Sequence, residues 1–214
     1  MARAVIFVNG SLPNLELVRP LIQPGDTLLA ADGGTQHALD LGLTPSIIIG
    51  DMDSLNPDVR RSMERAGARL IQYSRDKDET DLELALEHAL SSGHDRILLV
   101  GALGRRLDQT LGNLALLTAP RLAGIDIRLD DGVEEVFFTR STCQVAGQPG
   151  EVVSLFPWGG EVGGIVTTGL RWQLNGEDLS PHRTRGISNE LVANLAGISI
   201  KSGLLLVVHR RQKS

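Results

Sequence analysis

The chain has 214 residues, of which 42% are hydrophobic and only 3% aromatic, and its formal net charge is −5. These values fit a globular chain whose core is packed mainly by aliphatic side chains. An acidic chain is a poor general nucleic-acid binder, so we expect no nucleic-acid partner. The single cysteine, Cys143, excludes an internal disulfide, and no run approaches the ~18 apolar residues of a membrane span. We therefore expect a cytoplasmic protein with no membrane partner.

The first 130 residues alternate short apolar runs with amphipathic segments. Helices are predicted over 35–41, 57–66, 81–90 and 108–117, and the spacing of Leu82, Ala85, Leu86 and Ala89 is typical of one apolar helix face. The apolar runs predict buried parallel strands over residues 4–8, 27–31, 46–49, 69–72 and 96–100. This alternation predicts an α/β fold with a Rossmann-like, mostly parallel sheet.

The pattern changes near residue 130, where Asp130-Asp131-Gly132 predicts a turn. Short β-type segments then cover 133–139, 151–156, 165–168, 198–200 and 204–209, with glycine-rich turns between them. Regularly spaced strands of this kind predict a small antiparallel sandwich or barrel. We therefore predict two domains, an α/β domain over 1–131 and an all-β domain over 132–214. Because a domain of about 80 residues has a marginal core, the second should pack on its neighbour or on another subunit.

Acidic and glycine-rich segments lie just after the predicted strands. They are residues 31–34 (ADGG), 50–54 (GDMDS), 76–81 (DKDETD), 101–104 (GALG) and 105–108 (RRLD). In an open α/β sheet, such segments converge on one crevice at the carboxyl ends of the strands. Their composition indicates a site that holds a polyphosphate through a divalent cation.

Each segment also has a structural explanation. Asp51 and Asp53 are candidate Mg²⁺ ligands, but Asp53 or Ser54 would equally cap the helix that follows. In the next segment, Thr80 is predicted to cap the helix that begins at Asp81. Lys77 could reach a phosphate there, although a solvated run of charges fits equally well.

The segment from Gly101 to Asp108 precedes another predicted helix. Glycines allow the backbone to approach a phosphate, and Arg105 and Arg106 could clamp a transferring phosphoryl group. The alternative is a simple turn with Asp108 as the helix cap. Upstream, Gly33-Gly34 fits either a tight turn or the close approach of a nucleotide.

Taken together and in order, these motifs resemble the thiamine pyrophosphokinase family. The resemblance rests on residues 31–34, 49–54, 78–86 and 101–113, and on 167–174 (TTGLRWQL) and 186–190 (GISNE), so it covers nearly the whole chain. It implies a homodimer whose α/β domain binds ATP and whose β-sandwich helps to bind thiamine. The implied reaction transfers a diphosphate from ATP to the thiamine hydroxyl, with Mg²⁺ as cofactor and release of AMP. A related diphosphokinase for a pterin, or a non-catalytic thiamine or nucleotide sensor, is the alternative.

The resemblance also implies roles for individual residues. By this resemblance, the metal and the triphosphate are surrounded by Asp51, Asp53 and Asp81. Which aspartate accepts the proton of the thiamine hydroxyl is left open. Arg106 and Asp108 complete the catalytic set. The nucleotide-binding residues would be Asp32, Gly33, Gly34, Lys77, Thr80, Gly104 and Arg106.

Thiamine would contact Asp81 together with Ser188 and Asn189, the latter pair reaching it across the dimer interface. Trp172 or Trp158 could stack on one of its rings, or either could fill the β-domain core. Gln109 departs from the pattern, because many members have a histidine there, so a mechanism that needs a histidine base at this position would not apply.

Overall fold

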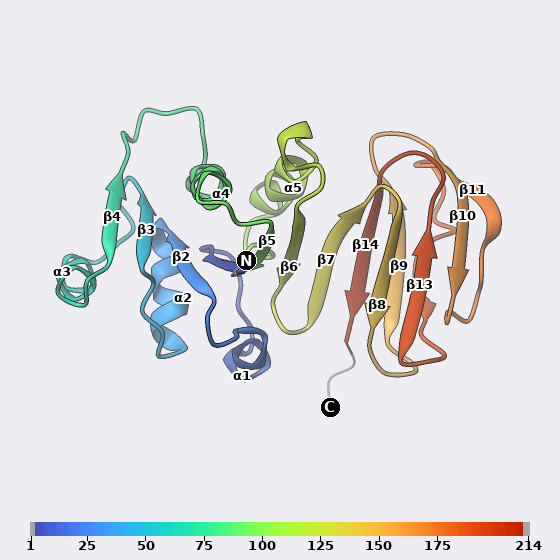
Figure 1. The fold of residues 1–214 in the computed structure, drawn as a ribbon, viewed down its shortest axis with the longest axis horizontal. Coiled ribbons are helices and arrows are strands. Elements are labelled where there is room, and N and C mark those ends of the chain that lie inside the picture. The colour runs from blue at the N-terminus through green and yellow to red at the C-terminus, as the bar shows by residue number, and fades with distance from the viewer. Residues whose placement is uncertain (1–2, 212–214) are drawn as a thin grey trace. The chain divides into compact units, whose positions relative to one another are not determined.

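The computed structural model describes residues 3–211, and the chain forms two compact units that divide between Gly132 and Val133. All helices of the described residues belong to the N-terminal unit, whereas the C-terminal unit is built from strands (Figure 1). The predicted class, α/β followed by all-β, is therefore confirmed.

The sheet of the N-terminal unit is parallel, with its strands in the order β6-β5-β1-β2-β3-β4. The strands are β1 (Ala4–Phe7), β2 (Thr27–Ala31), β3 (Ile47–Gly50), β4 (Arg69–Gln72), β5 (Arg96–Val100) and β6 (Asp126–Asp130). From β1 the chain runs outward to β4 and then returns to β5 on the other side of β1. The strand order thus reverses between β1 and β5, where open α/β sheets usually bind ligands.

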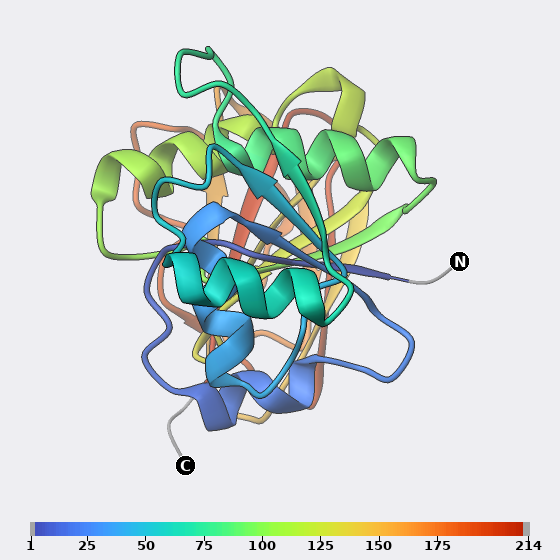
Figure 2. The ribbon, with the colours of Figure 1, turned by 90° about the vertical axis from the view of Figure 1, so that its left-hand side faces the viewer.

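Helices cover both faces of this sheet. They are α1 (Leu15–Val18), α2 (Thr35–Asp40), α3 (Pro57–Arg65), α4 (Asp81–Ser91) and α5 (Leu107–Leu116). Figures 1 and 2 show α4 and α5 on one face and α1, α2 and α3 on the other. The predicted apolar face of α4 is buried, including Leu82, Ala85 and Leu86.

Among the α-helices and strands of this unit, α1 and β6 have no counterpart in the prediction. The four-residue α1 is too short to display a helical period. In β6, polar and apolar residues alternate, unlike the continuous apolar runs by which the other strands were found.

The C-terminal unit contains two antiparallel sheets, in the orders β12-β9-β14-β7 and β11-β10-β13-β8. Their strands are β7 (Glu134–Thr139), β8 (Thr142–Ala146), β9 (Val152–Pro157), β10 (Val162–Thr168), β11 (Asn175–Leu179), β12 (Asn189–Glu190), β13 (Leu195–Ser199) and β14 (Leu205–Arg210). One apolar core joins the sheets, with Leu155 and Val207 from the first and Ile165 and Ile198 from the second. The predicted sandwich is confirmed, although β8, β11 and β12 were not predicted.

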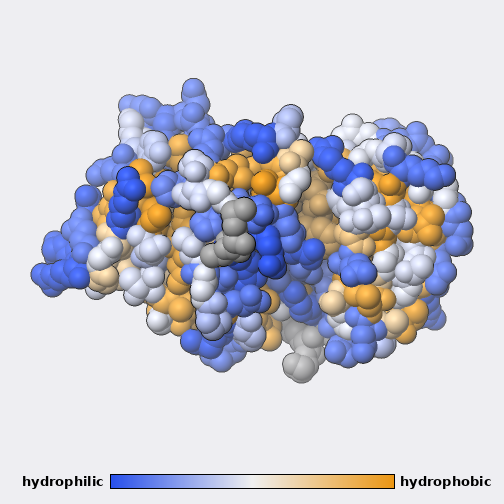
Figure 3. All heavy atoms as spheres, viewed as in Figure 1, coloured by the Kyte–Doolittle hydropathy of each residue, from blue (hydrophilic) through white to orange (hydrophobic). Residues whose placement is uncertain are grey.

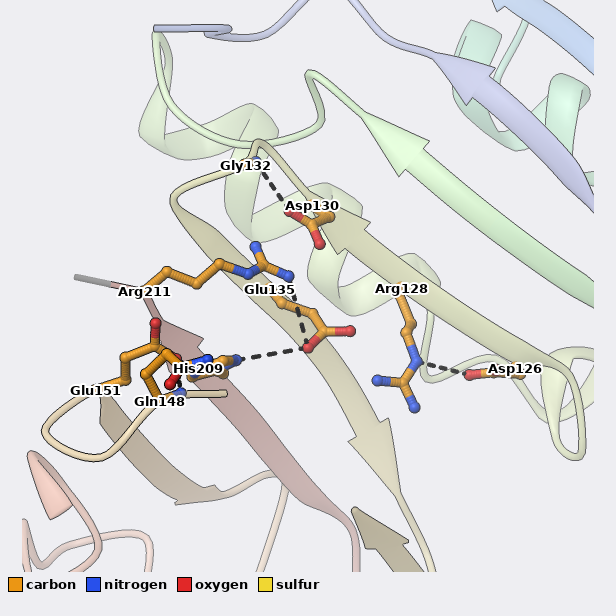
Figure 4. A network of polar contacts seen from close by, with 9 residues as sticks. All are labelled: Asp126, Arg128, Asp130, Gly132, Glu135, Gln148, Glu151, His209 and Arg211. Carbon is orange, nitrogen blue, oxygen red and sulfur yellow. Dashed lines mark hydrogen bonds and ion pairs between the residues drawn. The ribbon is translucent and has the colours of Figure 1, made fainter. Parts of the chain in front are cut away.

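A buried histidine interrupts this apolar unit. His209 on β14 is 0% exposed, and its Nε2 lies 2.8 Å from Oε2 of Glu151 (Figure 4). The backbone N–H of Gln148 donates to the same carboxylate oxygen, at 3.0 Å. On the other side of the ring, Nδ1 lies 3.7 Å from Oε2 of Glu135. These contacts tie β14 to β7 and to the loop before β9.

Hydrophobic residues are interspersed with hydrophilic ones on the face seen in Figure 3. The most exposed large apolar side chains are Leu107 in the N-terminal unit and Trp172 and Val192 in the C-terminal unit. No helix among residues 3–211 combines the length and apolar character needed to cross a membrane.

Candidate functional site

A cleft of about 710 Å³ opens at the carboxyl ends of the parallel strands. Each of the five acidic and glycine-rich segments between residues 31 and 108 supplies residues that line this cleft. Its walls come from the loops after β1, β2, β3 and β5 and from the segment that leads into α4, through Asn9, Gly10, Asp32, Gly33, Ser54, Lys77, Thr80, Asp81, Gly104, Arg105 and Arg106. The cleft lies where the strand order reverses, as expected for a ligand site.

The loops meet so closely that two glycines have no room for a side chain. A Cβ at Gly10 would lie 2.2 Å from the carbonyl oxygen of Gly101, and one at Gly50 would lie 2.7 Å from the Cβ of Asp32. Gly10 and Gly50 therefore bring the ends of β1, β5, β2 and β3 together at the cleft.

Three non-glycine residues around the cleft have left-handed backbone conformations. Their φ angles are 41° at Asp32, 67° at Met52 and 60° at Arg105. Such conformations cost about 1–3 kcal/mol each and gather at functional sites, where the surrounding structure holds them in place. The strain here is concentrated in the loops that carry the acidic and basic groups.

Asp32, Asp51 and Asp81 form a group of carboxylates, with one oxygen of each within 4.8 Å of the others. Asp32 is only 6% exposed, and its Oδ1 is buried without a hydrogen-bond partner among the described residues. A buried carboxylate oxygen that lacks a donor is suited to a cation. Mg²⁺ prefers such oxygen ligands and usually needs only two or three from the protein, so these residues fit the ion.

The electrostatics of this group support the same interpretation. Burial raises the pKa of Asp32, a hydrogen bond from Ser54 partly opposes the rise, and the charges of Asp81 and Asp51 add to it. Burial alone lowers the pKa of Lys77, but its hydrogen bond to Asp81 and the surrounding carboxylates raise it above the ordinary value. Nζ of Lys77 lies 2.8 Å from Oδ1 of Asp81. Lys77 is thus a cation that partly neutralises the group.

Asp53 lies outside this group. Its carboxylate oxygen is 3.3 Å from Nη1 of Arg75, and both side chains are exposed. Its backbone N–H donates to Oδ1 of Asp51 at 2.9 Å and so orients that ligand. The alternative capping role is wrong for Asp53 and for Ser54, because Asn56 caps α3 by accepting from the N–H of Asp58. The metal role of Asp53 stays a prediction.

Two arginines stand at the mouth of the cleft in the loop after β5. Nη1 of Arg105 donates to Oδ1 of Asn9 at 2.9 Å, and Arg106 makes two hydrogen bonds to Asp108, at 3.1 and 2.5 Å. The Arg106 hydrogen bond, with that from the Gln109 N–H, lowers the pKa of Asp108. Asp108 is therefore an ionised partner of Arg106. It does not cap α5, which begins one residue earlier, at Leu107.

The segment before α4 also has its predicted local structure. Oγ1 of Thr80 accepts from the N–H of Glu83 at 3.2 Å, so Thr80 caps the helix. The side chain of Glu83 instead pairs with Arg121, at 2.6 Å. Gly34 lies beneath the cleft, with no room for a Cβ beside the Phe7 carbonyl oxygen. It can act on a ligand only through the shape of its turn.

The sequence analysis gives no site role to Asn9 or Gly10, and none to Asn113, although Asn113 ends the segment 101–113 that carries the resemblance. Asn9 and Gly10 follow β1 as the other motifs follow their strands, so the same rule could have found them. Asn113 lies on α5, and its Nδ2 donates to the Ala102 carbonyl at 2.8 Å, which steadies the loop after β5. Its place in the resemblance motif marks the residue, but the helical pattern does not show that its side chain turns to the loop.

The C-terminal unit holds its predicted residues in one compact arrangement. The side-chain amide of Asn189 accepts from the Trp172 N–H at 3.0 Å and donates to the Trp172 carbonyl at 2.7 Å. Asn189 is buried, whereas Trp172 is 55% exposed. Asn189 thus fixes the backbone that presents the indole.

The other residues of this region have distinct environments. Ser188 has a φ of 59°, and its N–H donates to Oγ of Ser154 at 3.0 Å. The guanidinium of Arg171 lies 5.0 Å from the centre of the Trp172 ring and pairs with Glu190. Trp158 packs edge-on against Phe138, with 5.4 Å between ring centres, as expected of a packing residue.

The family model for the thiamin pyrophosphokinase catalytic domain matches residues 18–129, and the model for its vitamin B1 binding domain matches 142–205. The chain belongs to the thiamin pyrophosphokinase family. It is therefore an enzyme, and the resemblance inferred from the ordered motifs is confirmed.

Individual relatives agree with this assignment. Thiamine pyrophosphokinase of Bacillus subtilis (strain 168) is 32% identical over 84% of this chain and 85% of its own length. Thiamine pyrophosphokinase 1 of Oryza sativa subsp. japonica is 28% identical over 98% of this chain and 88% of its own. The crystal structure of the Bacillus subtilis thiamine pyrophosphokinase superposes with a TM-score of 0.88 at 26% identity, covering 100% of both chains.

A weaker and partial likeness corresponds to the pterin alternative. The 6-hydroxymethyl-7,8-dihydropterin pyrophosphokinase of Pyrococcus furiosus is 29% identical over 92 residues, 41% of this chain and 38% of its own. The likeness to the thiamine enzymes extends over both units, so it favours the thiamine assignment.

Proposed function

We propose that this enzyme transfers a diphosphate from ATP to the hydroxyl of thiamine, giving thiamine diphosphate and AMP with the help of Mg²⁺. The observation that carries the proposal is the carboxylate group of Asp32, Asp51 and Asp81, with Lys77 beside it, in a chain that matches both domains of the family. Three acids and a lysine at this point of the sheet suit a metal-bound polyphosphate.

The chain's own residues would bind and orient the triphosphate. Asp32, Asp51 and Asp81 would hold Mg²⁺, which would supply positive charge next to the phosphate oxygens. Gly33 and Gly104 allow the backbone to approach the phosphates, and Lys77, Arg105 and Arg106 would neutralise charge on them. Thr80 would contribute through the N-terminus of α4, which it caps.

In the reaction, the thiamine oxygen bonds to the β-phosphorus, and the bond from that phosphorus to the bridging oxygen of the α-phosphate breaks. AMP leaves with that oxygen, and the hydroxyl proton passes to a base. Asp108 is a weak candidate for the base, because Arg106 lowers its pKa. The base is then another aspartate near the triphosphate, and not a side chain at position 109, which is glutamine rather than histidine. Catalysis is then chiefly positioning and charge neutralisation.

For thiamine, we propose that Trp172 and Ser188 reach the substrate and that Asn189 acts by holding Trp172 in place. The double hydrogen bond from Asn189 to the Trp172 backbone supports this division of roles. We further propose that the protein is a homodimer in which this surface faces the cleft of the other subunit, as the family resemblance implies. The exposed apolar side chains of Trp172, Ile187 and Val192 support a contact surface here.

The test is incubation of the protein with Mg-ATP and thiamine, followed by identification of both products. AMP and thiamine diphosphate should appear in equal amounts. ADP with thiamine monophosphate would contradict the proposal, turnover of a hydroxymethylpterin but not thiamine would favour the pterin alternative, and binding without turnover would favour the sensor. Cytoplasmic location and the absence of a nucleic-acid partner stay predictions.

A further inference from the structure

The buried pair of His209 and Glu151 takes no part in the proposed reaction (Figure 4). Because a carboxylate only accepts, Nε2 of His209 carries the hydrogen of the 2.8 Å bond to Glu151. The same carboxylate oxygen accepts from the N–H of Gln148, and the Glu151 N–H donates to the Gln148 carbonyl at 3.1 Å. A buried carboxylate costs free energy unless it is hydrogen-bonded, so these contacts favour one conformation of the Glu151 loop, residues 147–151.

The Glu151 loop is joined to Leu191, which is only 1% exposed. The N–H of Gly150 donates to the Leu191 carbonyl at 2.8 Å, and the Leu191 N–H donates to the Glu151 carbonyl at 2.9 Å. A Cβ at Gly147 would collide with Oε2 of Glu151 and would lie 2.8 Å from Cδ1 of Leu191. It would also lie 2.9 Å from Nε2 of His209. Leu191 therefore packs directly on the part of the loop that the buried pair holds.

Leu191 also belongs to the segment 189–192, which supports the segment 169–172 that carries Trp172. Leu191 forms an antiparallel bridge with Leu170. Two backbone hydrogen bonds of 2.9 Å flank this bridge, from Arg171 to Glu190 and from Val192 to Gly169. A continuous set of contacts thus leads from the buried pair, through Leu191, to the backbone that presents the indole.

We propose that His209 and Glu151 are positioning residues for thiamine, which fix the place of the Trp172 indole through Leu191. The inference rests on the proposed function, in which Trp172 contacts thiamine. Neither side chain of the pair reaches the substrate, because His209 is 0% and Glu151 7% exposed. A fully hydrogen-bonded buried pair specifies one arrangement of its surroundings, which suits a role in positioning.

Two replacements of Glu151 test the proposal. Glu151→Leu removes the acceptor of both side-chain hydrogen bonds, whereas Glu151→Gln keeps an oxygen that can accept from His209 and from Gln148. Glu151→Leu should raise the KM for thiamine several-fold, with the KM for ATP and kcat nearly unchanged. Glu151→Gln should keep the thiamine KM of the unmodified protein. The control is Val162→Ala, which loses buried packing in the same core at the end of β10 far from Gly169, and should change neither KM.

A second measurement follows the indole without any substrate. The chain has two tryptophans, so Trp158→Phe leaves Trp172 as the only one. In this background Glu151→Leu should lower the fluorescence anisotropy of Trp172 and increase its quenching by acrylamide, while Glu151→Gln and Val162→Ala should not. Circular dichroism would verify that each variant is folded. If Glu151→Leu does not fold, Leu191→Val loosens the same contact while keeping the buried pair, and should give the same two changes.

Unchanged anisotropy and an unchanged KM for thiamine in folded Glu151→Leu would overturn the proposal. An equal rise of KM in Val162→Ala would also overturn it, because the effect would then follow from general loss of stability. So would a change in anisotropy without a change in the KM for thiamine. Absence of thiamine turnover by the unmodified protein would instead refute the proposed function, and the anisotropy would still decide whether the pair positions Trp172.

Discussion

Replacement of Asp32 by asparagine tests the carboxylate group by stability as well as by activity. At the 4.8 Å that limits the separation of the three ligand oxygens, two unit charges repel by about 3.5 kcal/mol at an effective dielectric constant of about 20. Lys77, at 2.8 Å from Asp81, offsets part of this repulsion. We therefore expect Asp32→Asn to raise the free energy of unfolding of the metal-free protein by about 2 kcal/mol at neutral pH, since asparagine keeps the shape and removes one charge.

The pH dependence has a definite sign. The pKa of Asp32 is raised by burial and by Asp81 and Asp51, against the hydrogen bond from Ser54. A raised pKa means that the folded protein holds the proton more tightly than the unfolded chain, so stability is lost as the pH rises through the folded pKa. The advantage of Asp32→Asn should consequently be present at neutral pH and shrink in acid.

Thermal unfolding in EDTA and in excess Mg²⁺ would measure the effect. A gain of about 2 kcal/mol corresponds to about 4–8 °C for a chain of this size. Added Mg²⁺ should stabilise the unmodified protein and have much less effect on Asp32→Asn, which should also lose diphosphate transfer.

Asp53→Asn is the matched control, because Asp53 lies outside the group and its backbone hydrogen bond to Asp51 does not depend on its side chain. A lower melting temperature of Asp32→Asn in EDTA, with an undiminished response to Mg²⁺, would refute the reasoning. Loss of the Mg²⁺ response in Asp53→Asn would confirm the predicted role of Asp53 as a ligand.

Three further outcomes are expected. Trp172→Ala and Asn189→Ala should each raise the KM for thiamine several-fold, about 1 kcal/mol or more, and leave the KM for ATP nearly unchanged, as steady-state kinetics would check. Mixed dimers of an inactive Asp51→Asn subunit and an Asn189→Ala subunit should contain one unaltered site, and so should show the low thiamine KM of the unmodified protein once mass spectrometry confirms exchange; exchanged dimers with only the raised KM of Asn189→Ala would contradict a site shared between subunits. His209→Leu should destabilise the C-terminal unit by about 2 kcal/mol or more, measured by urea unfolding, because the buried Glu151 carboxylate loses a partner at 2.8 Å.

The sequence predicts the convergence of the cleft loops well, because each motif follows an apolar run and parallel strands bring their carboxyl ends to one edge. It does not predict which acids point toward one another. Between Asp51 and Asp53 the choice depends on Met52, whose φ of 67° makes a tight turn that separates the two side chains. The left-handed backbone at Asp32, with a φ of 41°, likewise decides where its carboxylate points. The composition of the motif does not reveal this conformation.

The role of Asn189 was equally out of reach of the sequence. Its partner, Trp172, lies 17 residues earlier in the chain, and only the fold brings the two together. A motif that contains an asparagine indicates a polar contact but not whether that contact is with a ligand or with the protein backbone. In this chain the side-chain amide of Asn189 is hydrogen-bonded to the backbone of Trp172, and the indole of Trp172 is the side chain that stays exposed.

The charges of the cleft explain why a metal and a polyphosphate should bind together. Three carboxylates and Lys77 leave a net charge of about −2, which repels a free polyphosphate and which one divalent cation neutralises. Once the cation is bound, the remaining negative charge of the triphosphate faces Arg105 and Arg106 at the mouth. The strained backbone at Asp32, Met52 and Arg105 holds both sets of groups in position before the ligand arrives. Little reorganisation then remains for the transfer step, where positioned charge contributes most.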